Sequence, residues 1–202
     1  AQADTLNDIL RWRRDVRHFR TDPVAESVID RLRGAMDMAP SVGNSRPWRV
    51  LRVIDPGKRA AVQEIFERCN HEAAAGYDDA TKAEYVRLKL AGLRDAPVHL
   101  AVFTDTIPAE GRGLGRRTMP ETLQFSTVMA IHTLWLAART ENIGLGWVSI
   151  LEPAAVQSLF DVPRSWVFTG YLCLGHAEFA DDRSLLHRTG WQCDTPTHWQ
   201  DC

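Results

Sequence analysis

Residues 123–138 read LQFSTVMAIHTLWLAA and contain no formally charged side chain. They form the middle of a helix that we predict over residues 121–142, and apolar residues occur on every face of that helix. A helix that is apolar all round must be buried on all sides. The run therefore predicts a central core helix, a subunit interface, or both, with Gly144 as the cap at its C-terminal end.

Shorter predicted helices and strands alternate along the sequence before and after this helix. Further helices are predicted from Thr5, after Pro23, from Pro56, and over residues 81–93 and 153–160. Strands are predicted at residues 48–54, 98–104, 147–151 and 166–174. Strands that alternate with helices indicate one α+β or α/β domain over residues 1–202, with helices covering a sheet.

The composition excludes several classes of protein. The chain has 202 residues, of which 45% are hydrophobic and 25% charged, and its formal net charge is -2. Such values are typical of soluble globular domains and give no electrostatic reason to expect nucleic acid or an anionic membrane as partner. The scattered histidines form no metal-ligand spacing, so we expect no metal. No apolar run is long enough to span a bilayer and no signal-peptide pattern is present, so we expect a cytoplasmic protein.

The clearest charged motif is RRDVR at residues 13–17. One interpretation is a solvated charge cluster at the end of a helix. The other is an anion clamp, because guanidinium groups bind phosphate or an anionic ring edge through paired hydrogen bonds. The motif alone leaves both interpretations open.

Three further segments are candidates for a site. Residues 40–48, PSVGNSRPW, combine turn formers with several hydrogen-bonding side chains. Residues 144–150, GLGWVSI, place two glycines before a predicted strand, where backbone can approach a flat ligand closely, and a serine within it. The glycines at 111, 113 and 115 do not match a dinucleotide fingerprint and predict a mobile surface loop instead.

These segments together are similar to those of a known family. The chain also carries LKL at residues 88–90, LGR at 114–116, LWLAAR at 134–139 and LCLG at 172–175. With these motifs it resembles the nitroreductase-like flavoproteins from about residue 7 to Trp191, and among them the flavin-cleaving 5,6-dimethylbenzimidazole synthases. Asp15 carries the narrower resemblance, because ordinary nitroreductases usually have serine at that position. The chain departs from the family pattern at Arg46, which replaces a glutamine, and after Trp191, where an arginine is missing.

The resemblance implies an α+β fold in which helices wrap a mainly antiparallel sheet, and an intertwined homodimer that binds FMN at its interface. The helix at residues 121–142 would form much of that interface. Asp15 and Ser149 match the residues to which the family's chemistry is assigned, with Asp15 accepting protons. The implied flavin contacts are Arg13, Arg14, Asp15, Val16, Arg17, Pro40, Ser41, Asn44, Lys89 and Ser149.

The implied reaction uses reduced FMN as both cofactor and substrate, with O2 as co-substrate. Its products are 5,6-dimethylbenzimidazole, the lower ligand of vitamin B12, and erythrose 4-phosphate. A separate flavin reductase would supply the reduced FMN. The alternatives are an NAD(P)H-dependent FMN nitroreductase or quinone reductase, and a flavin-binding module without catalysis.

Overall fold

In a computed structural model that describes residues 1–86, 88 and 90–202, the chain forms a four-stranded antiparallel sheet with strand order β1-β2-β4-β3. The strands are β1 (Trp48–Arg52), β2 (Val98–Asp105), β3 (Gly144–Val148) and β4 (Trp166–Gly175). The central strand β2 is almost wholly buried, and β4 is buried over its C-terminal part.

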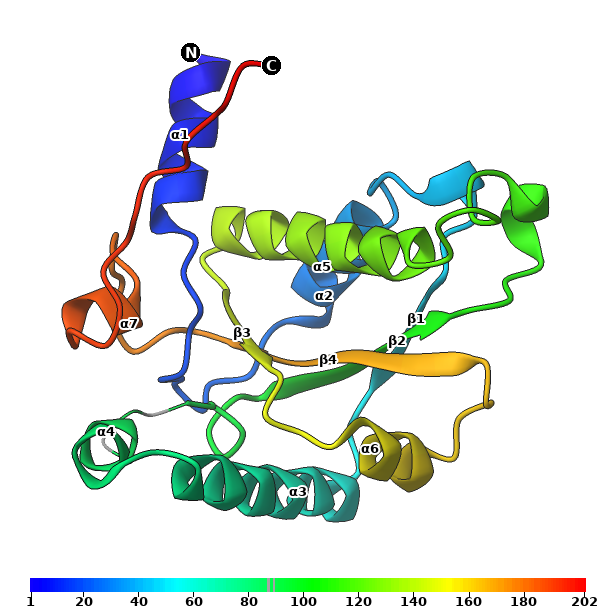
Figure 1. Cartoon of the computed structure of the whole chain (residues 1–202). Coiled ribbons are helices and arrows are strands. Elements are labelled where there is room, and N and C mark those ends of the chain that lie inside the picture. The colour runs from blue at the N-terminus through cyan, green and yellow to red at the C-terminus, as the bar shows by residue number, and fades with distance from the viewer. Residues whose placement is uncertain (87, 89) are drawn as a thin grey trace.

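Helices cover both faces of this sheet (Figure 1). The two layers are α2 (Glu26–Met36) with α5 (Thr122–Thr140), and α3 (Pro56–Ala75) with α6 (Pro153–Phe160). Val102 and Leu172 belong to the core beneath α2 and α5, whereas Phe103 and Tyr171 belong to the core beneath α3 and α6. Successive strand residues point to opposite faces, so β2 and β4 supply both cores. The predicted α+β fold, with helices around an antiparallel sheet, is confirmed.

The remaining elements lie at the margins of the two layers. They are α1 (Gln2–Trp12), η1 (Val42–Asn44), α4 (Asp79–Tyr85), η2 (Glu110–Gly113) and α7 (Leu185–Arg188). Helix α1 projects away from the layered body (Figure 1) and contains no buried residue, although Leu6 and Leu10 on it are apolar. Within the described part of the chain, no helix has the length and apolar character needed to cross a membrane.

Helix α5 is buried on only one of its faces. Its inward residues include Ala130, Ile131 and Leu134, which pack on the sheet and on α2. Three apolar residues on other sides of α5 stay exposed, with Phe125 at 53%, Val128 at 39% and Met129 at 40%. The predicted core helix is therefore confirmed, while burial on all sides is not reached within one chain.

Several predicted boundaries were wrong for local reasons. Helix α1 begins at Gln2 rather than after Thr5, and α4 ends at Tyr85 instead of reaching residue 93. Gly144 is not the cap of α5, because it is the first residue of β3. Asn142 takes the left-handed conformation there instead, with φ 55°, and the Ile143 amide donates to the Ala138 carbonyl oxygen at 2.8 Å. Strand β3 consequently begins and ends three residues earlier than predicted.

A buried histidine links the central strands. His99 is 1% exposed, its Nδ1 lies 2.9 Å from the Tyr171 hydroxyl, and its Nε2 lies 3.0 Å from the Ala96 carbonyl oxygen. Since a carbonyl oxygen only accepts, Nε2 carries the proton and Nδ1 accepts from the tyrosine. Burial, with a smaller contribution from the Arg59 charge, lowers the pKa of His99 from 6.5 to about 4. The folded chain therefore holds this ring neutral.

We expect the free energy of unfolding to fall as the pH drops from 6.5 towards 4. Over that range the unfolded chain protonates His99 while the folded chain does not, which amounts to about 3 kcal/mol when complete. Urea unfolding between pH 7.5 and pH 4.5 measures this loss. His99→Gln should flatten the profile. A His99→Gln profile parallel to that of the wild type would contradict the assignment.

Candidate active site

Residues 13–17 run in extended conformation beside the edge strand β3. Asp15 forms a parallel bridge with Leu145, and the Val16 amide donates to the Leu145 carbonyl oxygen at 3.0 Å. A Cβ atom at Gly146 would lie 2.1 Å from the Val16 carbonyl oxygen, and one at Gly144 would lie 2.9 Å from the Val16 side chain. We predicted that Gly144 and Gly146 would let a flat ligand approach the backbone closely. That interpretation was wrong, because Val16 of the same chain fills the space beside both glycines.

The Asp15 carboxylate is fixed through both of its oxygens. Oδ1 accepts from the Trp147 amide at 2.9 Å, and Oδ2 accepts from Arg17 Nε at 2.7 Å. The side chains are 29% exposed for Asp15 and 14% for Arg17, so the ion pair is partly shielded from solvent. Charge-assisted hydrogen bonds of this kind hold a carboxylate in one orientation.

The indole of Trp147 lies against Gly170 of β4. A Cβ atom at Gly170 would come within 2.3 Å of the Trp147 Nε1 atom, so only glycine leaves room for the ring. This packing holds Trp147, and with it the amide that binds Asp15, flat on the sheet. The carboxylate is thus positioned by the sheet itself rather than by a loop.

The other two arginines of the motif have different surroundings. The Arg13 guanidinium carbon lies 4.7 Å from the ring centroid of Trp135, a cation–π contact from α5. Burial, and secondly the neighbouring charge of Arg14, lower the pKa of Arg13, yet a guanidinium stays charged at neutral pH. Arg14 donates through Nη2 to the carbonyl oxygens of Arg11 and Asp182, the latter at 3.0 Å. Arg14 is therefore committed to the protein's own backbone.

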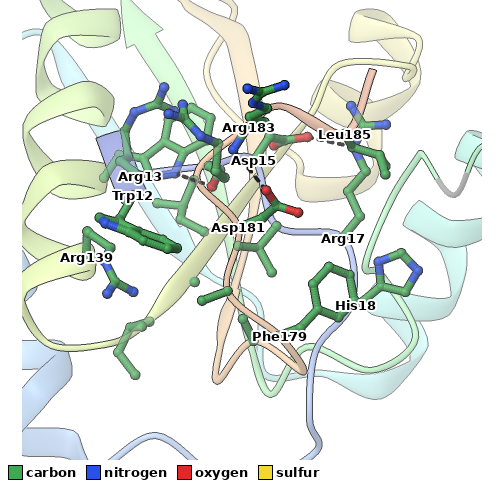
Figure 2. A pocket seen from close by; sticks show the side chains of 18 of the residues that line it. Trp12, Arg13, Asp15, Arg17, His18, Arg139, Phe179, Asp181, Arg183 and Leu185 are labelled. Carbon is green, nitrogen blue, oxygen red and sulfur yellow. Dashed lines mark hydrogen bonds and ion pairs between the residues drawn. The ribbon is translucent and has the colours of Figure 1, made fainter. Parts of the chain in front are cut away.

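These residues line a small pocket between residues 12–18, the C-terminal end of α5 and residues 177–188 (Figure 2). Its volume is about 70 Å³. The lining contains Arg13, Arg14, Arg17, Arg139, Arg183 and Arg188, against two carboxylates, those of Asp15 and Asp181. The pocket is consequently rich in positive charge and suited to an anion.

The second group of candidate residues lies at the opposite end of α5. The Ser41 hydroxyl accepts from the Arg46 amide at 3.1 Å, and Asn44 is exposed with φ 53°. The Val42 amide donates to Ser126 Oγ at 3.0 Å, which fixes this loop near the start of α5. Since Arg139 at the far end of α5 lines the pocket, on the order of 20 Å of helix separates the two groups within one chain.

The remaining candidates divide in the same way. Pro40 is exposed and belongs to the loop group, and Val16 belongs to the arginine group. Ser149 is not inside a strand as predicted, because β3 ends at Val148; it is exposed and lies two residues beyond the amide that binds Asp15. Lys89 lies outside the described residues.

The glycine-rich segment at residues 111–115 packs on the loop group. A Cβ atom at Gly43 would lie 2.9 Å from the Leu114 carbonyl oxygen, and one at Gly111 would lie 2.8 Å from the Ser45 Cβ atom. The two loops therefore interlock through their glycines. In the described residues, no group of three or more His, Cys, Asp or Glu side chains could hold a metal ion.

Sequence reasoning missed three pocket residues. Trp135 lies within the uncharged run of residues 123–138, where an aromatic residue is expected to pack in the core. Arg139 follows directly after that run. Arg183 lies in a polar C-terminal stretch with no pattern that would indicate a pocket.

Comparison with known proteins identifies the family. The model of the nitroreductase family matches residues 10–176. The chain belongs to the nitroreductase family. A 5,6-dimethylbenzimidazole synthase of Rhodobacter capsulatus is 58% identical over 98% of this chain and 95% of its own length. The synthase of Rhodospirillum rubrum is 50% identical over 96% of this chain and 92% of its own length.

Within the nitroreductase family the chain therefore belongs with the 5,6-dimethylbenzimidazole synthases, and it is an oxidoreductase. Among solved structures, iodotyrosine deiodinase bound to FMN and 3-iodo-L-tyrosine superimposes with a TM-score of 0.72 at 21% identity. The match covers 86% of this chain and 90% of that chain, and it confirms the nitroreductase fold.

We expect Gly146→Ala to destabilise the fold by about 1–3 kcal/mol, because its methyl group would collide with the Val16 carbonyl. Gly34→Ala is the matched control. Nothing lies within 4 Å of a Cβ atom there and Gly34 lies inside α2, so this change should stabilise by about 0.5–1 kcal/mol. Urea unfolding of both variants tests the prediction, and equal effects of the two substitutions would refute it.

Proposed function

We propose that this chain cleaves reduced FMN in the presence of O2, giving 5,6-dimethylbenzimidazole and erythrose 4-phosphate. The observation that carries the proposal is Asp15, a carboxylate held by Arg17 and by the Trp147 amide at the rim of an arginine pocket. The high identity to the two synthases supports it. The reaction would take place in the cytoplasm, with reduced FMN delivered by a separate flavin reductase.

The donor set fits a flavin phosphate ester. Arg13 and Arg17 offer guanidinium groups, which bind phosphate and carbonyl oxygens well. Ser41, Asn44 and Lys89 would add polar contacts. Reduced FMN would supply the electrons for O2 and the carbon skeleton of the product, while the protein supplies orientation and proton handling.

Asp15 and Ser149 would do the proton handling. A carboxylate with one hydrogen bond at each oxygen keeps further lone pairs, so Asp15 can still accept a proton from a bound substrate. Its two donors prevent it from rotating away. Ser149 is exposed next to β3 and offers a hydroxyl that can donate or accept.

The working form would be a homodimer with FMN at its interface. One chain keeps Ser41 and Asn44 far from Arg13, at the other end of α5, so a second copy is needed to bring the two groups together. The exposed apolar residues of α5 and α1 give such a copy a surface to cover. Large apolar interfaces are typical of obligate dimers.

The deciding experiment is aerobic incubation with chemically reduced FMN, followed by mass analysis for 5,6-dimethylbenzimidazole. We expect product from the wild type. Rapid reduction of bound FMN by NADH or NADPH, at about 10 per second, together with the absence of this product, would instead support the alternative reductase. A protein that binds FMN and does neither would be a binding module.

We expect Asp15→Asn to abolish ring cleavage while keeping most FMN affinity, because an amide cannot accept a proton as a carboxylate does. Ser149→Ala should lower the yield without unfolding the chain, and in both variants reduced FMN should reoxidise with release of hydrogen peroxide. Arg17→Ala should also weaken binding, by about 1.5–3 kcal/mol. The measurement is product per reduced flavin beside a dissociation constant, with the exposed Asp37→Asn as control. A wild-type yield from Asp15→Asn would sink the catalytic role.

We expect the double substitution Val128→Lys and Met129→Lys to give a monomer that binds FMN poorly, since two charges would have to be desolvated at the interface. Ile54→Lys, on a side chain that is 74% exposed two residues beyond β1, is the control. Analytical sedimentation at micromolar protein concentration measures the molecular mass and so distinguishes monomer from dimer. A wild type that is monomeric with FMN bound would disprove the dimer.

A further inference from the structure

A second pocket lies between α2 and the sheet, and its volume is about 320 Å³. Helix α2 packs against α5 on the same side of the sheet (Figure 1), and the pocket remains between α2 and strands β1 and β2. Among the described residues, only Ile143 lines both this pocket and the arginine pocket. The second pocket is therefore a separate feature of the chain.

Apolar side chains from two layers form the walls of this second pocket. Ile29, Leu32 and Met36 follow one another at helical spacing, so they lie on one face of α2 and form one wall. Side chains of β1 and β2 form the facing wall, among them Trp48, Val50 and Leu100. Trp48 is 9% exposed, whereas Val50 is 37% exposed. Trp48 thus lies inside the pocket and Val50 lies at its mouth.

The charged groups at the mouth neutralise one another. Arg52 donates through Nη1 and Nη2 to the two carboxylate oxygens of Glu26, each at 2.7 Å. Arg33 is paired with Asp30 at 2.9 Å. Both arginines among the described lining residues therefore have a carboxylate of their own. The pocket consequently has little attraction for an anion such as FMN, in contrast to the arginine pocket.

The volume and the lining together select a ligand of two fused rings. A cavity of about 150 Å³ takes one benzene ring. A volume of about 320 Å³ has room for a bicyclic aromatic compound, and sites for small molecules begin at about 300 Å³ and combine apolar walls with a few polar groups. Glu26 and Asp30 supply such groups, because carboxylate oxygens keep lone pairs to which a ring N–H can donate.

We propose that this pocket binds a neutral bicyclic aromatic compound that carries a ring N–H, such as indole or a benzimidazole. The rings would contact Trp48 and the apolar face of α2, and the N–H would face Glu26 and Asp30 at the mouth. The product of the proposed function, 5,6-dimethylbenzimidazole, belongs to this class, so the enzyme would retain its product here. Only that last step rests on the proposed function.

The test is isothermal titration calorimetry of indole and of 5,6-dimethylbenzimidazole at pH 8, on the full-length protein saturated with oxidised FMN. We expect each compound to bind once per chain. Val50→Trp should weaken both about tenfold or more, because the larger side chain fills the mouth. Val167→Trp is the matched control and should change neither constant, since Val167 is 36% exposed on β4 and does not line the pocket.

A second measurement needs no substitution. Benzimidazole-5-carboxylate has the same rings with a negative charge, and it should bind the wild type about tenfold or more weakly than 5,6-dimethylbenzimidazole, because the arginines at the mouth are already paired.

Four outcomes would overturn the inference. They are no binding of either ring compound at millimolar concentration, an unchanged affinity in Val50→Trp, equal affinity for the carboxylate, and binding seen only in the absence of FMN, which would assign it to the flavin site. Product formation by the wild type tests the proposed function separately. Indole binding in a chain that makes no product would therefore retain the pocket and reject the synthase.

Discussion

The contact between Val16 and Gly146 is the constraint on which the rest of the site depends. A backbone carbonyl can approach strand β3 this closely only because Gly146 has no side chain. The contact places Asp15 beside Leu145 and within reach of the Trp147 amide, and Arg17 closes the other side of the carboxylate. The charged Asp15 side chain is thereby fixed beside an edge strand, β3, that has no charged residue of its own.

Helix α5 imposes the second constraint, which acts at longer range. The helix is straight enough to hold the arginine pocket at one end and the Ser41 loop at the other (Figure 1). Neither segment can move far enough to meet the other. The Ser41 loop is bound to α5 through Val42 and Ser126, and residues 13–17 are bound to β3 through Val16 and Leu145. The exposed side chains of Phe125 and Val128 lie between the two ends. The same helix therefore separates the two half-sites in one chain and offers the surface through which two chains would join them.

The sequence predicted the fold class and most elements, because burial patterns are local. Residues 153–160 form α6 with the predicted bounds, and Pro56 starts α3 as expected. The errors occurred where a long-range contact overrides a local signal. Gly144 looks like a helix cap in isolation, but Val16, far away in the chain, needs that position free of a side chain. The short α4 and the shifted β3 likewise depend on neighbours that no periodicity reveals.

For the site, the sequence identified the RRDVR motif but could not assign a task to each arginine. Arg17 neutralises Asp15, Arg14 ties α1 to the C-terminal segment, and Arg13 stacks on Trp135. An arginine that is already paired with a carboxylate adds little net charge to a ligand site, whereas an unpaired one adds its full charge. Arg14 binds the Asp182 carbonyl oxygen and Arg13 stacks on Trp135, both more than a hundred positions away, so a motif of five letters cannot encode these tasks.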